Sequence, residues 1–191
     1  MMTDHTPTRS GRMEVIRGCM FSGKSDALIA RVEEARRAGR HVAVFKHASD
    51  NRYDPADVVT HDQRHLAAAP IERAAELATD ATDADVIAVD EAHFFDAGLP
   101  AVCRQLADDG KRVILAGLDR DAWGLPFGPM PRLAELADEI TTTTAICAVC
   151  GATACRTQRI TPIGESMIGG EGDYEPRCEK CFVPPPAELW R

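Results

Sequence analysis

Residues 18–25 read Gly-Cys-Met-Phe-Ser-Gly-Lys-Ser, and they constrain the fold more than any other stretch of the chain. They fit Gly-x4-Gly-Lys-Ser/Thr, in which glycines allow backbone angles that turn N–H groups toward an anion. Lys24 adds a mobile positive charge, and Ser25 offers a hydroxyl to Mg²⁺. The flanks fit a strand at residues 13–16 and a helix at 24–38. The sequence thus predicts a triphosphate-binding loop; the alternative is a loop with incidental glycines.

A second informative stretch, residues 85–91, is a short apolar run that ends in Asp90 and Glu91. A strand of this kind resembles the acidic arm of a nucleotide site, in which the strand-ending carboxylate holds Mg²⁺ through water. Glu91 then occupies a position that suits a general base facing the γ-phosphate. Taken alone, the pair could equally be acids that begin a turn, so the prediction depends on the loop at residues 18–25.

Strand and helix patterns alternate along most of the chain. We expect further strands at residues 41–46, 67–71, 112–117 and 139–146, and further helices at 72–78, 97–109 and 129–136. This alternation predicts an α/β fold with a doubly wound, mostly parallel sheet. The polar segment 48–62 is either a solvated loop or, through Arg52, a clamp on phosphate or magnesium. The loop 118–128 is expected at the carboxyl edge of the sheet, where open α/β folds bind ligands.

Four of the seven cysteines form two Cys-x2-Cys pairs, Cys147 with Cys150 and Cys178 with Cys181. Paired knuckles with this spacing predict a closed, tetrahedral Zn²⁺ site, with a redox pair or unrelated thiols as the alternatives. The other three, Cys19, Cys103 and Cys155, are interpreted as packing or incidental residues, although Cys19 could be sensitive to oxidation. Between the pairs, glycine-rich residues 164–172 are either a cover over a ligand or a floppy hairpin tip.

Length and composition set the remaining bounds. The chain has 191 residues, 45% hydrophobic content and a formal charge of −8, which excludes a large basic surplus for nucleic acid binding. No apolar run approaches a membrane span and no signal-peptide core is present, so we expect a cytoplasmic protein. The predicted organisation is a disordered N-terminus at 1–11, a nucleotide-binding domain at 12–144, a zinc-binding domain at 145–183 and a tail at 184–191.

The motifs together resemble the cellular, zinc-containing (type II) thymidine kinases, from residue 13 to residue 181. Besides the glycine-rich loop and the cysteine pairs, the resemblance rests on short matches in the order of the chain. These are Asp50-x-Arg52-Tyr53, Thr60-His61-Asp62, Asp90-Glu91-x-x-Phe94-Phe95, Pro126-Phe127-Gly128, Thr157-x-Arg159, Ile168-Gly-Gly170 and Tyr174. His93 departs from the usual glutamine, and Ala122 departs from the usual phenylalanine that lies against the base. We hypothesise that the neighbouring Trp123 turns inward and supplies the missing ring.

The resemblance implies a P-loop, RecA-like fold, a small zinc and lasso domain, and transfer of the ATP γ-phosphoryl group to the 5′-hydroxyl of thymidine. Glu91 would be the catalytic base. ATP and Mg²⁺ would lie against Gly18, Cys19, Met20, Phe21, Ser22, Gly23, Lys24, Ser25, Asp50, Asn51, Arg52, Asp90, Ala92 and His93. Thymidine would contact Phe94, Leu118, Ala122, Thr157, Glu165, Ser166, Met167, Ile168, Gly169 and Tyr174. A homotetramer and feedback inhibition by thymidine triphosphate (dTTP) are also implied.

Two other functions compete with this interpretation. A nucleic-acid-dependent P-loop ATPase with a zinc module would show ATP hydrolysis stimulated by DNA or RNA. The acidic balance and an aromatic content of 5% disfavour it, because single-strand grooves combine positive charge with stacking rings. A non-catalytic zinc adaptor that merely retains a nucleotide fold would show no turnover with thymidine. The sequence therefore predicts a kinase that needs neither nucleic acid nor a membrane as a partner.

Overall fold

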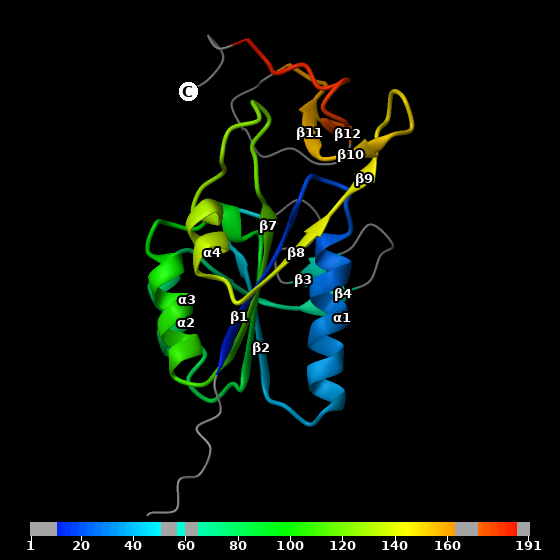
Figure 1. Ribbon diagram of the computed structural model, residues 1–191. Coiled ribbons are helices and arrows are strands. Elements are labelled where there is room, and N and C mark those ends of the chain that lie inside the picture. Colours follow the sequence, from blue (N-terminus) through cyan, green and yellow to red (C-terminus); the bar gives the residue numbers. More distant parts are fainter. Residues whose placement is uncertain (1–10, 51–56, 60–64, 163–171, 187–191) are drawn as a thin grey trace, which may run out of the picture.

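The computed structural model describes residues 11–50, 57–59, 65–162 and 172–186, and its centre is a parallel β-sheet (Figure 1). The six strands lie in the order β5-β2-β6-β7-β1-β8, and every neighbouring pair is parallel. This confirms the predicted fold class. The strands are β1 (Arg12–Gly18), β2 (Val42–His47), β5 (Ala69–Ile71), β6 (Val86–Asp90), β7 (Arg112–Leu118) and β8 (Glu139–Thr143).

Helices cover both faces of the sheet, which explains why the central strands are almost continuously apolar. Helix α1 (Lys24–Arg37) lies on one face, and α2 (Ala74–Asp80), α3 (Leu99–Asp108) and α4 (Met130–Leu136) lie on the other (Figure 1). Each face has its own buried cluster. In β6, for example, Ala88 packs toward α1 and Val89 packs toward α3, so alternate side chains of one strand serve two cores. None of these helices, in the part of the chain that is described, could cross a membrane.

Two of the expected strands are each divided into two short strands. The expected strand at 139–146 becomes β8 in the central sheet and β9 (Ala145–Ile146), which pairs antiparallel with β10 (Thr153–Ala154). The expected strand at 67–71 becomes β4 (His65–Ala67), which pairs with β3 (Asp57–Val59), and β5 in the central sheet. At the break between β8 and β9 the chain changes its partner strand within a run of strand-like residues, so the sequence pattern alone does not mark that break. The run at 67–71 is different, because it contains three alanines and Pro70, which are poor strand formers.

The carboxyl ends of the central strands point toward the part of the chain that holds the cysteine pairs. There, β9 and β10 lie beside a second antiparallel pair, β11 (Arg156–Arg159) and β12 (Tyr174–Arg177) (Figure 1). In β11 and β12, Arg156 pairs with Arg177 and Arg159 pairs with Tyr174. The fold therefore brings the zinc-site candidates and the carboxyl edge of the sheet to the same end of the molecule.

The amino edge of the sheet, at the opposite end, is held together by a charged cluster around Glu14. This β1 side chain is 1% exposed, and its carboxylate accepts from Arg112 Nε at 2.6 Å and from Arg31 Nη1 at 3.0 Å. Arg12 Nε lies 2.7 Å from the same carboxylate. Burial raises the pKa of Glu14, but Arg112, Arg12 and Arg31 together hold that pKa below its usual value.

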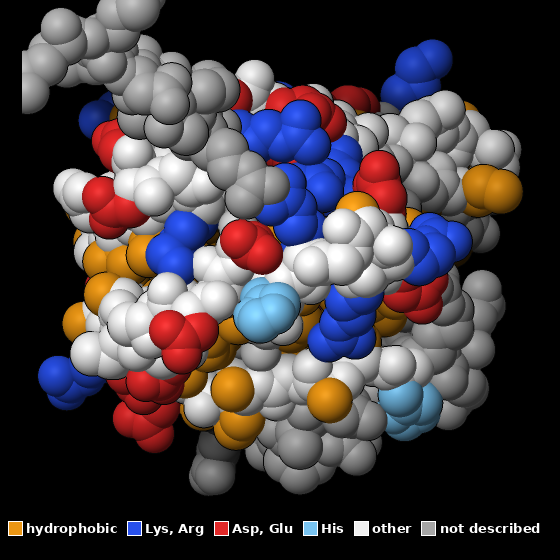
Figure 2. All heavy atoms as spheres, turned by 90° about the horizontal axis from the view of Figure 1, so that it is seen from below, with side chains coloured by type: hydrophobic (Ala, Val, Ile, Leu, Met, Phe, Trp, Pro, Cys, Tyr) orange, Lys and Arg blue, Asp and Glu red, His pale blue; other side chains and the backbone are white. Residues whose placement is uncertain are grey.

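Figure 2 shows the molecule from below, on the side of the amino edge of the sheet; basic side chains gather at the middle of this face and are flanked by acidic ones. A hollow of about 370 Å³ opens here, lined partly by Arg12, Arg40 and Arg112. Acidic Glu34 and Asp85 line it too, and α1 and α3 both end beside it. Since helix C-termini carry partial negative charge, the arginines are balanced locally, and we interpret the cluster as structural.

Candidate nucleotide site at the carboxyl edge of the sheet

The glycine-rich loop connects β1 to α1 at the carboxyl edge, as the sequence predicts for residues 18–25. Gly18 has φ 155° and Gly23 has φ 80°, and Gly23 is the N-cap of α1. A Cβ atom at Gly18 would lie 2.4 Å from the Thr143 carbonyl oxygen and 2.9 Å from Ser22 Oγ. Both glycines are thus required by the local backbone. The loop ends at the positive end of a 14-residue helix, which favours a bound anion.

Hydrogen bonds within the loop fix its shape. Ser22 Oγ donates to the Cys19 carbonyl oxygen at 2.7 Å and lies 2.7 Å from Thr143 Oγ1 on β8. Lys24 Nζ also donates to the Cys19 carbonyl oxygen, at 2.7 Å, so its ammonium group is folded back over the loop. The loop is therefore a closed turn with a positive charge on it. It comprises the residues predicted to lie against the phosphates of ATP, which are Gly18, Cys19, Met20, Phe21, Ser22, Gly23, Lys24 and Ser25.

Asp90 ends β6 directly beside this loop. Ser25 Oγ donates to Asp90 Oδ2 at 3.0 Å, although the two residues are far apart in the sequence. Asp90 is 5% exposed, and burial followed by the charge of Glu91 raises the pKa of its carboxyl group to about 7. The Glu91 N–H, the Ser25 hydroxyl and Lys24 act in the opposite direction. A hydroxyl and a carboxylate in contact form an oxygen donor pair that suits Mg²⁺.

Glu91 has an unusual backbone conformation, with φ 51° and ψ 39° in the left-handed region. A non-glycine residue is strained there by about 1–3 kcal/mol, and such strain clusters at functional positions. Its N–H donates to Asp90 Oδ1 at 2.9 Å, and it begins a short 3₁₀ helix, η1 (Ala92–Phe94). The sharp turn after the strand therefore sets both carboxyl groups at one edge of the sheet.

His93 belongs to η1 and contacts the end of β7. The backbone N–H of Leu118 donates to His93 Nδ1 at 3.1 Å, so this nitrogen acts as an acceptor and carries no proton. Glu91 Oε2 lies 3.4 Å from the same nitrogen, which therefore supplies no proton to that carboxylate. The His93 ring is buried and lies 4.5 Å from the Phe127 ring, centre to centre. The structure thus places His93 where it ties η1 to the end of β7.

The end of β2 contributes two charged groups to the same edge. Lys46 is 2% exposed, and its Nζ lies 3.7 Å from Asp50 Oδ2. Asp50 was predicted at the ATP site, whereas Lys46 was predicted only as the last residue of the strand at 41–46. A lysine at the end of a β-branched strand usually reaches solvent, so the sequence gives no direct signal that this one is buried. Asn51 and Arg52 lie outside the described residues.

Three residues predicted to contact thymidine lie near the end of β7 and in η1. Leu118 and Ala122 are each 8% exposed, while Phe94 is partly buried. The Phe94 ring lies 5.8 Å from the Phe127 ring and 6.0 Å from the His47 ring, centre to centre. The predicted lasso residues lie outside the described residues; they are Glu165, Ser166, Met167, Ile168 and Gly169.

Trp123 was expected to turn inward and to replace the phenylalanine that Ala122 lacks. In the structure its indole Nε1 instead donates to the carbonyl oxygen of Pro186 at 3.5 Å. Its backbone N–H donates to Asp121 Oδ1 at 2.9 Å, which fixes the turn that carries it. The ring therefore lies against the C-terminal segment.

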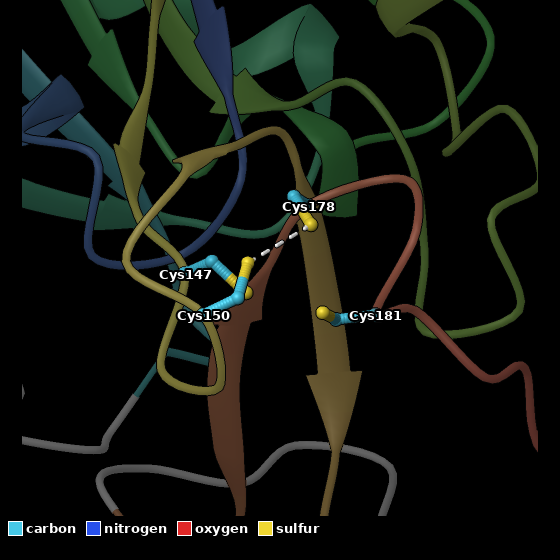
Figure 3. A group of neighbouring side chains, drawn as sticks. All are labelled: Cys147, Cys150, Cys178 and Cys181. Carbon is cyan, nitrogen blue, oxygen red and sulfur yellow. Dashed lines mark hydrogen bonds between the residues drawn. The ribbon is translucent and has the colours of Figure 1, made fainter.

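Strands β9, β10, β11 and β12, with the cysteine pairs that follow β9 and β12, form a small module beyond the central sheet. The four paired cysteines come together in this module, as Figure 3 shows. Cys147, Cys150, Cys178 and Cys181 have sulfur atoms within 4.8 Å of one another, and Cys150 Sγ lies 3.6 Å from Cys178 Sγ. Four thiolates at about 2.3 Å from one Zn²⁺ ion would be separated by about 3.8 Å, so the cluster fits a structural zinc site. Of the cysteines outside this cluster, Cys103 is fully buried, and burial raises the pKa of its thiol to about 12.

This module also contacts the glycine-rich loop. Thr157 Oγ1 accepts from the Met20 N–H at 3.0 Å, and Cys19 Sγ donates to the Ala154 carbonyl oxygen at 3.5 Å. Cys19 packs in one buried cluster with Ala154 and two of the paired cysteines. Burial raises the pKa of the Cys19 thiol, so little thiolate is available for the oxidation that its position in the loop suggested. Thr157 was predicted to contact thymidine, which stays a prediction; in the structure its hydroxyl accepts from the backbone of the glycine-rich loop.

Tyr174 lies on β12, where its hydroxyl accepts from Arg159 Nη1 at 2.8 Å. The Arg159 guanidinium also lies 5.2 Å from the centre of the Tyr174 ring. Just beyond the end of β11 and just before β12, Thr161 Oγ1 donates to Asp173 Oδ1 at 2.8 Å. These contacts join the two ends of the segment that carries the undescribed residues 163–171.

The fold and the site define a class of protein: a parallel α/β protein in which a glycine-rich loop, a lysine, a serine and two strand-end acids meet at one edge of the sheet. Comparison with known proteins makes the class specific. The thymidine kinase family model matches residues 11–182, and the chain therefore belongs to the thymidine kinase family.

Curated relatives agree with this assignment. A thymidine kinase of Rhodothermus sp. is 49% identical over 176 residues, which cover 92% of this chain and 83% of that protein. A thymidine kinase of Bacteroides thetaiotaomicron is 47% identical over 176 residues, with 92% and 88% covered. One of Porphyromonas gingivalis is 43% identical over 175 residues, with 91% and 86% covered.

Proposed function

We propose that this protein transfers the γ-phosphoryl group of ATP to the 5′-hydroxyl of thymidine, giving thymidine monophosphate and ADP. The observation that carries the proposal is family membership over almost the whole chain, since the family match spans residues 11–182. The geometry at the carboxyl edge supports it independently, because a loop with a lysine and two strand-end carboxylates is what phosphoryl transfer requires.

On the phosphate side, the loop and Lys24 stabilise charge on the transferring group. The N–H groups of the loop and the N-terminus of α1 bind the phosphates, and Lys24 Nζ moves from the Cys19 carbonyl oxygen, 2.7 Å away, to a phosphate oxygen. Ser25 and Asp90 would hold Mg²⁺, which neutralises charge between the β- and γ-phosphates when bound. Asp50, with Asn51, Arg52, Ala92 and His93, completes the proposed ATP side.

On the nucleoside side, Glu91 is the proposed general base. Its carboxylate accepts the proton of the 5′-hydroxyl as the oxygen attacks the γ-phosphorus, and the bond to the β-phosphate oxygen breaks. Phe94, Leu118 and Ala122 line the wall for the base, and Tyr174 with residues 165–169 covers it. The left-handed conformation of Glu91 fixes the start of its side chain, so the base needs little reorganisation before reaction.

The module holds one Zn²⁺ ion through Cys147, Cys150, Cys178 and Cys181 in this proposal. A site closed by four thiolates leaves no position for substrate, so its role is to order the module. A homotetramer, feedback inhibition by dTTP and a cytoplasmic location belong to the same proposal and rest on family membership alone.

The proposal is tested by measuring nucleoside-dependent ADP formation with a panel of nucleosides, and separately with single-stranded DNA in place of nucleoside. We expect thymidine to be phosphorylated with clear preference over deoxycytidine and the purine deoxynucleosides, and DNA to have no effect. Phosphorylation of a different nucleoside, or DNA-stimulated ATP hydrolysis without nucleoside, would contradict the proposal.

A further inference from the structure

We infer that Lys46 is a positioning residue of the ATP site: its buried ammonium group holds the Asp50 carboxylate at the carboxyl edge, beside Asp90. The inference rests on the proposed function. Lys46 Nζ lies 3.7 Å from Asp50 Oδ2, and the two side chains are 2% and 13% exposed. The contact is thus a largely desolvated ion pair at the end of β2.

The register of the sheet places this pair next to the proposed magnesium ligands. Lys46 of β2 is the direct partner of Asp90 of β6. Paired residues in adjacent strands project to the same face, and adjacent strands lie about 4.8 Å apart. Asp90 in turn accepts from Ser25 at 3.0 Å. Lys46 therefore lies on the face of the sheet that carries the Ser25 and Asp90 oxygens.

The surroundings of Lys46 make a purely packing role unfavourable. On the same face of the sheet, Val44 and Ala88 belong to an apolar cluster with Val58 and Leu66 from β3 and β4. Burying an ammonium group among such side chains is costly unless a partner compensates, and an apolar residue would extend the cluster at no such cost. A lysine at this position is therefore better explained by the ion pair that its ammonium group forms with Asp50.

The charge balance of the edge supports the same conclusion. Asp90 and Glu91 are adjacent at the end of β6, and Asp50 lies in the turn after β2, the strand that pairs with β6. Like charges at one edge of the sheet repel one another. Lys24 is held at the loop, where its Nζ donates to the Cys19 carbonyl oxygen. Among the described residues at the end of β2, Lys46 supplies a positive charge, and it also anchors the turn that follows, in which the Asp50 N–H donates to the His47 carbonyl oxygen at 2.9 Å.

The test compares Lys46→Met with Lys111→Met, a matched control at the opposite edge. Lys111 Nζ donates to the carbonyl oxygens of Ala81, Thr82 and Ala84 at 3.0, 2.8 and 2.7 Å, so it is also an anchored lysine. We expect Lys46→Met to lower kcat/KM for MgATP by about 10–100-fold and to raise the Mg²⁺ concentration for half-maximal rate, as loss of supporting contacts does at metal sites. The thymidine KM and all parameters of Lys111→Met should stay within about twofold.

Asp50→Asn and the double variant establish whether Lys46 acts through Asp50. We expect Asp50→Asn to reproduce the MgATP defect and the double variant to be no worse than the more impaired single variant. Multiplying defects, or MgATP kinetics of Lys46→Met within twofold of wild type, would overturn the inference. If Lys46→Met does not fold, Asp50→Asn decides: an unchanged Mg²⁺ dependence in that variant would equally overturn it.

Calorimetric binding of MgATP to the same variants separates this inference from the proposed function. Wild-type protein that binds MgATP but leaves thymidine unphosphorylated would contradict the proposed function alone. Equal MgATP affinity in wild type and Lys46→Met would contradict the role of Lys46 alone.

Discussion

Thr157→Val tests whether the cysteine-bearing module holds the glycine-rich loop in shape. Thr157 is 4% exposed, and its Oγ1 accepts from the Met20 N–H at 3.0 Å. Valine fills the same volume, so the change removes the acceptor without opening a cavity. A buried N–H left without a partner costs about 1–3 kcal/mol. Met20 is 9% exposed, so water can recover part of this, and we expect a cost of about 1–2 kcal/mol.

This free-energy cost should weaken ATP binding, because the glycine-rich loop is the proposed binding site for the phosphates. A penalty of about 1–2 kcal/mol on the binding conformation corresponds to an increase of about 5–30-fold in the ATP KM. If the same penalty falls on the folded state, the melting temperature drops by about 2–8 °C for a chain of this size. The assays are steady-state kinetics with each substrate varied in turn and a thermal melt.

Thr153→Val is the matched control, because Thr153 is an exposed threonine on the neighbouring strand β10. It should leave both the ATP KM and the melting temperature unchanged. An ATP KM for Thr157→Val within twofold of wild type would refute the coupling. A large rise in the thymidine KM alone would instead assign Thr157 to the nucleoside pocket, as the family resemblance implies.

Three further predictions follow from other parts of the structure. Purified protein should contain one zinc ion per chain, and Cys178→Ser should lose it; zinc-free wild type by elemental analysis would contradict the site. Glu14→Gln should destabilise the fold by about 2–4 kcal/mol, because it leaves three arginines around a neutral group, two of them mostly buried. The pKa of Glu14 is lowered in the folded state, so its carboxylate stabilises the fold above about pH 4.5 and loses this effect as the pH falls through the folded pKa. The free energy of unfolding from urea melts should therefore differ less between pH 7 and pH 3.5 in Glu14→Gln than in wild type. Glu91→Gln should lower kcat by about two to four decades with smaller changes in KM, and a loss below tenfold would move the base role to another residue.

The parts of the site that the sequence predicts are those carried by local chemistry. The loop at residues 18–25 has its own backbone requirements, and Asp90 ends a run whose apolar character marks a strand buried on both faces. Because the loop follows one parallel strand and Asp90 ends another, both are expected at the same edge of the sheet, where Ser25 and Asp90 are found in contact although 65 residues separate them.

The remaining features depend on which elements become neighbours, and local patterns do not encode that. From the sequence, Lys46 is expected to be a solvated residue at the end of a strand. Its burial and its position beside Asp90 follow only from the register between β2 and β6. Thr157 and Met20 are 137 residues apart, and no spacing rule connects them. The break between β8 and β9 falls inside uniform strand-forming residues because β9 leaves the central sheet for β10. Trp123 turns toward Pro186 because of a long-range contact that its own loop does not reveal.

The most direct test of the central claim is to identify the product formed from thymidine and γ-labelled ATP in the presence of Mg²⁺, by wild-type protein and by Lys24→Met. We expect one labelled thymidine 5′-monophosphate for each ADP with wild type, and loss of nearly all turnover in a correctly folded Lys24→Met variant, since Lys24 carries the positive charge of the loop. Label released as inorganic phosphate, or near-normal turnover by Lys24→Met, would contradict it.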